Sequence, residues 1–163
     1  MELLIPRESL FNPQYLLRKI SLPIKLTNNN DGQTRHYGMS ANQRIKYEKL
    51  IRATFGQQKP INVPVHVLVV RVLGKGQRLW DYSSILRGNW KQIEDAMVAC
   101  GFLHDDGPEY VNLAVGAQDN TDRTRESSTQ VLYFTTKEYY SQEIGYGCRT
   151  KRVSVRNPVN SHK

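Results

Sequence analysis

Apolar residues recur at helical spacing in two stretches of the chain. The first, residues 40–55, follows Ser40, carries basic residues on its wetter sides and ends at Gly56. The second, residues 88–101, ends at Gly101. Its apolar side chains form one inward stripe, made of Ile93, Ala96, Met97 and Cys100. The spacing therefore predicts two helices.

Four other stretches have the patterns of strands. Residues 64–73 are rich in β-branched side chains and apolar at odd and even positions, which is typical of a central strand buried on both faces. Residues 110–116 and 129–136 alternate apolar and polar side chains, and the run 21–26 predicts a short first strand. The polar connection 118–128 is long for a hairpin and is expected to be flexible. The expected inward face of 110–116 consists of Val111, Leu113 and Val115.

The order of these elements is strand, helix, strand, helix, strand, strand. It predicts an α+β fold, with a mixed sheet of about four strands and two helices packed on one side. The length of 163 residues suits one domain, which we place at residues 22–136. Residues 1–21, interrupted by two prolines, are expected to form a peripheral arm with one short helix, and residues 137–163 a basic, flexible tail.

The composition excludes several classes of protein. No apolar run approaches the roughly 18 residues that a membrane-spanning helix needs, and the first residues lack the basic and apolar regions of a signal peptide. The two cysteines offer neither a disulfide framework nor a CxxC motif for zinc. We therefore expect a cytoplasmic protein with no membrane segment.

Charge is distributed unevenly along the chain. The 23 Lys and Arg residues outnumber the 15 Asp and Glu residues, so the net charge is +8, which favours a polyanionic partner. Residues 81–109 are the exception, because six acidic and two basic side chains leave this segment with a net charge of −4. Such an acidic segment is expected where a protein holds a phosphate backbone and a divalent metal together. The alternative is a solvated acidic helix.

The acidic segment places carboxylates before, on and after the second helix. Asp81 precedes the helix, Asp95 shares its polar face with Lys91, and Asp105 and Asp106 follow it. A helix of about 14 residues is about 21 Å long. The carboxylates can therefore converge only if the neighbouring loops fold back over the helix.

If they converge, the chemistry is that of a metal site. Clustered carboxylates bind Mg²⁺, or Mn²⁺ in its place, and the metal activates a water molecule for attack on a phosphodiester. Lys91, the only lysine of the segment, would stabilise charge on the phosphate. The alternative is an ordinary surface ion pair between Lys91 and Asp95, worth about 0.3 to 0.5 kcal/mol.

A linked pattern runs through this segment: Asp81, Lys91, Asp95-Ala96, Gly101-Phe102 and Asp105-Asp106. It resembles the signature of the RusA-type Holliday-junction resolvases, a family of small phage and prophage nucleases, and the resemblance covers residues 22–136. It implies a RusA-like fold and a homodimeric, magnesium-dependent endonuclease that resolves four-way DNA junctions by paired phosphodiester hydrolysis. It also implies that Asp81, Asp95 and Asp106 are metal ligands, with Asp105 as a further candidate, and that Lys91 stabilises the phosphate.

The chain departs from the family pattern after the first aspartate. The family has a second aspartate two residues later, followed by asparagine, whereas this chain has Ser83 and Ser84. A serine cannot neutralise Mg²⁺, so either Asp105, Asp106 or Glu94 replaces the missing carboxylate or the activity is weakened. The alternative function is therefore a RusA-like protein that binds DNA without cutting it.

Basic and aromatic side chains along the chain are candidates for contacts to DNA. Tyr37 belongs to a polar loop that includes Arg35, where its ring can stack on an unpaired base. The expected phosphate contacts are Arg35, Arg44, Lys75, Arg78 and Arg87. The tripeptide at 74–76, GKG, lacks the rest of a P-loop, and the four histidines share no metal-ligand spacing.

Overall fold

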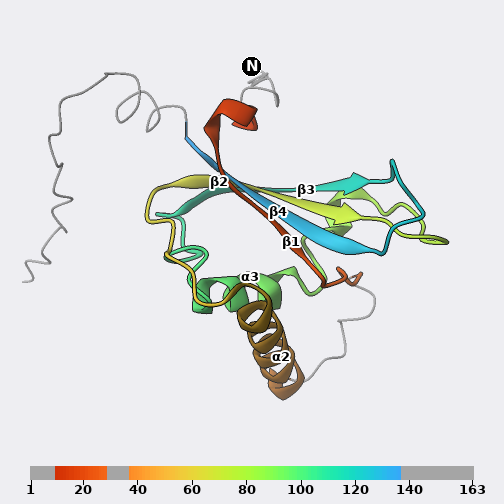
Figure 1. The fold of residues 1–163 in the computed structure, drawn as a ribbon, viewed down its shortest axis with the longest axis horizontal. Coiled ribbons are helices and arrows are strands. Elements are labelled where there is room, and N and C mark those ends of the chain that lie inside the picture. Colours follow the sequence, from red (N-terminus) through yellow and green to blue (C-terminus); the bar gives the residue numbers. More distant parts are fainter. Residues whose placement is uncertain (1–9, 29–36, 137–163) are drawn as a thin grey trace, which may run out of the picture.

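A mixed sheet with helices on one side forms the described part of the protein (Figure 1). The computed structural model describes residues 10–28 and 37–136. The strands there are β1 (Leu16–Leu22), β2 (Val65–Val72), β3 (Val111–Asp119) and β4 (Ser128–Thr135). The helices are α2 (Tyr37–Phe55) and α3 (Trp90–Ala99), with short 3₁₀ turns η1 (Pro13–Tyr15) and η3 (Tyr82–Ser84). The α+β prediction, with four strands and two α-helices, is confirmed.

The strands lie in the order β1-β4-β2-β3. β4 pairs antiparallel with both β1 and β2, whereas β2 and β3 are parallel. β2 is therefore an interior strand, as its apolar sequence predicts. Because parallel strands end at the same edge of a sheet, the segment that follows β2 and the connection from β3 to β4 lie at one edge.

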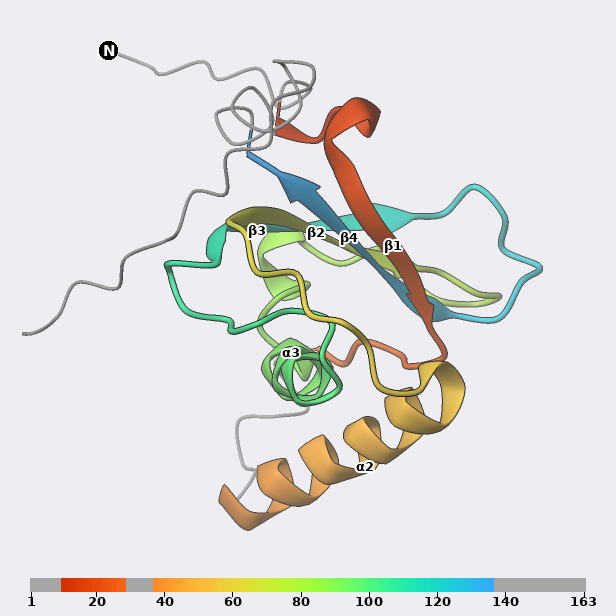
Figure 2. The ribbon, with the colours of Figure 1, turned by 60° about the vertical axis from the view of Figure 1, so that its left-hand side comes forward.

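The core lies between the sheet and the two helices (Figure 2). Alternate residues of β2, among them Val67 and Val69, are buried against the helices. On α3 the inward stripe that the sequence predicts is buried as well. A strand turns every second side chain to one face, and a helix turns every third or fourth, so each element buries a single face.

Neither α2 nor α3 covers the opposite face of the sheet (Figure 1). His66, Leu68 and Val70, which alternate with the buried residues of β2, are half-buried. The expectation that this strand is buried on both faces is therefore wrong, because both helices pack on the same side. At one place on this face the ring of Phe11 packs edge-on against His66 and Phe134.

The expected first strand at 21–26 is wrong in its position, because β1 ends at Leu22. The buried alternation continues beyond the strand to Ile24, which is why the sequence pattern extends further. Pro23 has no N–H to donate to a ladder. The hydroxyl of Thr129 donates to the Ile24 carbonyl over 2.7 Å, so a side chain replaces the ladder there.

The N-terminal boundary of the domain lies earlier than the expected residue 22, because β1 begins at Leu16. Residues 16–21, which we expected in a peripheral arm, are paired with β4 and belong to the sheet. The helical turn of this region is η1, immediately before β1. The expected arm over residues 1–9 and the expected tail over 137–163 lie outside the described residues.

A register shift reorients β3. Val65 pairs with Val111, but the residue after Val65 pairs with Leu113, so one residue of β3 has no counterpart on β2. Leu113 consequently lies on the open face, with 36% of its surface exposed. Ala114 packs against the core in its place. Of the expected inward residues of this strand, Val111 alone contacts the core.

Both helices end near glycines with positive φ, as the sequence predicts. Gly56 (φ 70°) follows α2, and Gly101 (φ 80°) follows the last turn of α3. Helix α2 begins earlier than the expected residue 40, so Tyr37 lies in the helix and not in the loop that we expected. Neither of the two described helices is long and apolar enough to cross a membrane.

Candidate metal and nucleic-acid site

Three carboxylates surround the ammonium group of Lys91. Lys91 Nζ lies 2.9 Å from Asp95 Oδ1 and 3.8 Å from Glu94 Oε2, and it also contacts Asp106 Oδ2. Asp95 and Glu94 lie one helical turn further along α3, where i,i+3 and i,i+4 side chains meet. Asp106 comes from the loop after the helix, so this loop does fold back over α3.

The start of α3 is fixed by Asn89, which is only 1% exposed. Asn89 Oδ1 accepts a hydrogen bond from the Thr27 N–H (2.8 Å), and Nδ2 donates to the Lys25 carbonyl (3.0 Å) and to Tyr47 Oη of α2 (2.6 Å). One amide therefore joins three elements. Lys91 lies two residues further along, in the first turn of α3, so these bonds also fix the place of its backbone.

Gly88 allows the backbone at Thr27 to lie close to the start of α3. A Cβ atom at this position would lie 1.6 Å from the Thr27 carbonyl oxygen, so no larger residue fits without a backbone shift. The segment before the polar loop is thus pressed against the entry to α3. This contact and the bonds of Asn89 hold residues 25–27 against the start of α3.

The loop that carries Asp106 is anchored on both sides. Before it, Phe102 and Leu103 are buried, and the His104 N–H donates to the Ile61 carbonyl (2.9 Å). After it, the Tyr110 N–H donates to the Gly107 carbonyl (2.9 Å). The half-buried Asp106 is consequently held toward Lys91, whereas Asp105 is exposed.

The pKa of Glu94 differs from that of an exposed glutamate. Burial raises the pKa of Glu94, the neighbouring Lys91 ammonium opposes this shift, and the Asp95 carboxylate adds to it. Glu94 therefore loses its proton less readily than an exposed glutamate. Lys91 itself is accessible, with 59% of its side chain exposed.

Asp81 lies outside the cluster of carboxylates around Lys91, between β2 and η3. Its side chain is exposed, and its carbonyl accepts a hydrogen bond from the Ser84 N–H (2.9 Å) at the start of η3. Within the described ranges, no ion pair or hydrogen bond joins Asp81 or Asp105 to the Lys91 cluster. The structure thus brings together Lys91, Asp95 and Asp106 of the expected site residues.

The donor chemistry of the cluster fits a hard cation in part. Asp95 and Asp106 both direct a carboxylate oxygen to one cation, the Lys91 ammonium. Mg²⁺ is commonly bound by one or two carboxylates together with water and substrate phosphates. In the described part of the chain no group of three or more His, Cys, Asp or Glu side chains has the arrangement of a complete metal site.

The expected DNA contacts are dispersed over several elements. Arg44 is exposed on α2, Lys75 and Arg78 are exposed in the segment after β2, and Arg87 is exposed between η3 and α3. Tyr37 is the first residue of α2. Arg35 lies outside the described residues.

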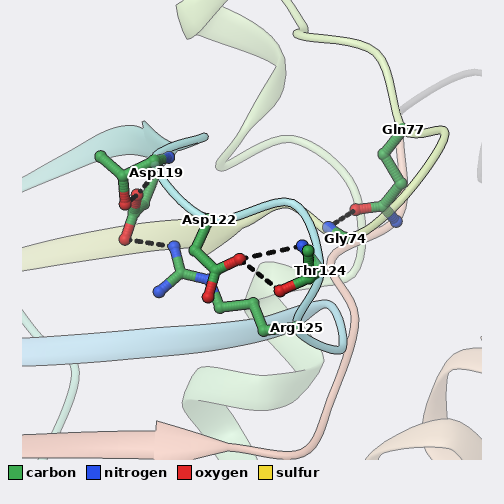
Figure 3. Close-up of polar contacts among 7 residues, drawn as sticks. Gly74, Gln77, Asp119, Asp122, Thr124 and Arg125 are labelled. Atoms are coloured by element: carbon green, nitrogen blue, oxygen red, sulfur yellow. Dashed lines mark hydrogen bonds and ion pairs between the residues drawn. The ribbon is translucent and has the colours of Figure 1, made fainter.

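The connection from β3 to β4 is braced by its own side chains (Figure 3). Asp119 accepts from the Thr121 N–H (3.0 Å), Asp122 accepts from the Thr124 N–H (2.9 Å), and the guanidinium of Arg125 lies 2.6 Å from Asp119 Oδ2. The flexibility that we expected from its length stays a prediction. Each aspartate forms a local turn that limits the backbone.

Sequence reasoning missed Asn89, which fixes the start of α3, and Gln118, which bonds to the backbone of Trp80 before Asp81. Asparagine before a helix is a signal for an N-cap, but the Asn89 side chain makes no cap hydrogen bond and bonds to distant backbone instead. Gln118 has no such signal, because its sequence context is that of any polar residue near the end of a strand.

The sequence was compared with models of protein families and with curated proteins. It matches no family model and no curated protein.

Proposed function

We propose that the protein is a metal-dependent, structure-selective DNA endonuclease that resolves four-way junctions, as the resemblance to RusA-type resolvases implies. The observation that supports it is the meeting of Lys91, Asp95 and Asp106 at one exposed place, although Lys91 and Asp106 are 15 positions apart. These are three of the residues to which the resemblance assigns catalytic roles. A structural ion-pair network would have the same contacts, and the two cases differ in whether a metal binds and DNA is cut.

In this proposal the roles follow from side-chain chemistry. Asp95 and Asp106 would hold Mg²⁺, for which Mn²⁺ can substitute, and Asp81 would supply a further carboxylate to the same cation, with Asp105 as the next candidate. A metal bound there would polarise the scissile phosphate and activate water. Lys91 turns from the carboxylates to the phosphate, where its ammonium stabilises the negative charge of the transition state. Its exposed side chain leaves room for that movement.

The basic surface supplies the affinity for DNA. Arg44, Lys75, Arg78 and Arg87 are exposed, and the chain has a net charge of +8. Two symmetric cuts across a junction require two active sites related by a twofold axis, so we propose a homodimer. Its place of action would be the cytoplasm of a bacterium, where such DNA is found.

A second candidate is a protein that binds branched DNA without cutting it. The observation in its favour is Ser83, an exposed serine at the position where the family has an aspartate. In this case the Lys91 cluster is a structural ion-pair network. Binding would then persist because the cationic residues do not depend on the carboxylates.

The decisive experiment incubates the purified chain with an end-labelled four-way junction and Mg²⁺ or Mn²⁺. The proposal predicts paired cuts in opposing strands, and it predicts that Asp95→Asn abolishes cutting while junction binding persists. Glu126→Gln is the control, because Glu126 is an exposed acid on the connection before β4. Binding without cutting in both metals would support the second candidate.

The proposed dimer is tested by sedimentation velocity at micromolar concentration, with and without junction DNA. A sedimenting mass of two chains is expected. A mass of one chain in both conditions would contradict the symmetric mechanism.

A further inference from the structure

The backbone before Asp81 is held by one side chain of β3. Gln118 Oε1 accepts a hydrogen bond from the Trp80 N–H (3.0 Å), and Gln118 Nε2 donates to the Trp80 carbonyl (2.8 Å). The side-chain amide therefore satisfies both backbone groups of Trp80, as a neighbouring strand would. Asp81 is the next residue, and its carbonyl is bonded to the Ser84 N–H. The backbone is fixed on both sides of the Asp81 side chain.

Arg71 supports the same arrangement from β2. It is the register partner of Gln118 in the sheet, and its Nη1 donates to Gln118 Oε1 (3.0 Å) and to the Arg78 carbonyl (2.9 Å). Its Cζ atom lies 3.6 Å from the centre of the Trp80 ring, which is the geometry of a cation–π contact. Two side chains thus hold the segment from Arg78 to Trp80.

Burial of Arg71 is costly. The residue is 4% exposed and its bonds go to neutral oxygens, and within the described ranges no acid forms an ion pair with it. Burial lowers the pKa of Arg71, and the charge of Arg123 lowers it further. An apolar side chain would pack in a sheet at less cost. The hydrogen bonds of Arg71 and Gln118 hold the backbone of residues 78–80 in one conformation. Asp81 follows this segment directly.

We propose that Gln118, supported by Arg71, is a positioning residue that holds Trp80 so that the carboxylate of Asp81 is presented to a divalent cation. The inference rests on the proposed function, in which Asp81 is a metal ligand. Gln118 does not touch the metal. Its influence passes through the backbone of Trp80, as residues behind a metal ligand commonly act on its orientation.

The test measures the affinity of the full chain for Mn²⁺ by electron paramagnetic resonance in the absence of DNA. Gln118→Met keeps an unbranched side chain and removes the hydrogen bonds. It is expected to weaken Mn²⁺ binding by about 10-fold to 100-fold. In the Asp81→Asn background the same substitution should change Mn²⁺ affinity little, because the residue that it positions is no longer a ligand.

Thr129→Val is the matched control. Thr129 is the register partner of Arg71 on the other side of β2, and its buried hydroxyl bonds to Ile24 and not to Trp80. This variant loses a buried hydrogen bond from the same part of the sheet. Its Mn²⁺ affinity should equal that of the parent. An equal loss of affinity in Thr129→Val would overturn the positioning role and indicate general destabilisation.

Arg71→Met provides a second variant in case Gln118→Met does not fold. The loss of a nearby positive charge would by itself tighten cation binding, whereas loss of the support for Trp80 weakens it. Weaker Mn²⁺ binding supports the inference, and equal or tighter binding overturns it.

The two proposals fail in different ways. If Asp81→Asn weakens Mn²⁺ binding and Gln118→Met does not, the positioning role is wrong and the metal site stands. If Asp81→Asn leaves Mn²⁺ affinity unchanged, Asp81 is not a ligand, and the ligand assignment in the proposed function is wrong together with this inference.

Discussion

Lys91 Nζ lies 2.9 Å from Asp95 Oδ1, and the same ammonium contacts Asp106. The sequence left two roles open for Lys91, as the partner of a surface ion pair or as the residue that stabilises a phosphate. The structure shows the ion pair. One ammonium cannot stay between two carboxylates and also neutralise a phosphate, so the proposed function requires Lys91 to leave the carboxylates when a metal binds.

Substitution of Lys91 separates these roles. In Lys91→Ala the single-turnover rate of junction cutting is expected to fall by orders of magnitude, because the ammonium acts mainly in the transition state. The carboxylates are no longer neutralised, so Mn²⁺ affinity should rise. Stability should change by less than about 1 kcal/mol, since the pair is exposed to solvent.

Lys49→Ala, which removes an exposed lysine of α2, is the control for this experiment. Lys91→Arg keeps the charge in a different geometry, so an intermediate rate would indicate a positioned ammonium. Full cutting activity in Lys91→Ala would remove Lys91 from the mechanism.

The segment after β2 is expected to contact phosphates. Lys75→Ala and Arg78→Ala should each weaken junction binding uniformly and reduce the slope of log affinity against log salt by about 1. Fluorescence anisotropy at several salt concentrations measures both quantities. Lys59→Ala, an exposed lysine before β2, is the control. An unchanged slope in both test variants would place the DNA elsewhere.

Asn89 is expected to matter for stability more than any exposed polar residue. Asn89→Ala removes three partly buried hydrogen bonds, to the backbone of Thr27 and Lys25 and to Tyr47 Oη. Each such hydrogen bond contributes about 0.5 to 1.5 kcal/mol. Thermal unfolding followed by circular dichroism should show a Tm lowered by roughly 5 to 10 °C. The exposed Asn112 provides the control: Asn112→Ala should unfold within a degree or two of the parent.

Asp119 predicts a pH dependence of stability. Hydrogen bonds from the hydroxyl and N–H of Thr121, and then Arg125, lower its pKa to about 2. The ordinary value of an aspartate is about 3.9. Because the folded pKa is the lower one, the ionised carboxylate stabilises the fold above about pH 4, and this contribution is lost as the pH falls toward about 2.

Urea unfolding measures this effect. Asp119→Asn should be less stable than the parent at pH 7, and the difference should shrink as the pH falls from about 4 to about 2. Glu109→Gln, at an exposed position before β3, should follow the parent across the same range. A constant difference between parent and Asp119→Asn would show that the carboxylate is not selectively bonded in its ionised form.

Several elements could be predicted because their signals are local. The β-branched run of β2, the apolar stripe of α3 and the glycines after both helices determine secondary structure through backbone preferences and side-chain period. Patterns of this kind need no knowledge of distant residues. The α+β class then follows from the order of the elements.

Tertiary structure decided the rest, because it depends on partners that are far apart in sequence. β1 stops at Leu22 although the buried alternation continues, since Asn89 and Thr129 bond to the backbone beyond it. Likewise, the register shift that turned Leu113 outward arises in the pairing with β2.

The candidate site also has features that the sequence predicts and features that only the tertiary structure decides. The acidic segment and its helical face could be read from the sequence, since residues one turn apart on a helix must be neighbours. The contact of Lys91 with Asp106 could not, because it depends on how the loop after α3 folds back. The bonds of Gln118 to Trp80 join positions 38 apart. A side-chain amide has no periodic signal, and its partner is selected only when the chain has folded.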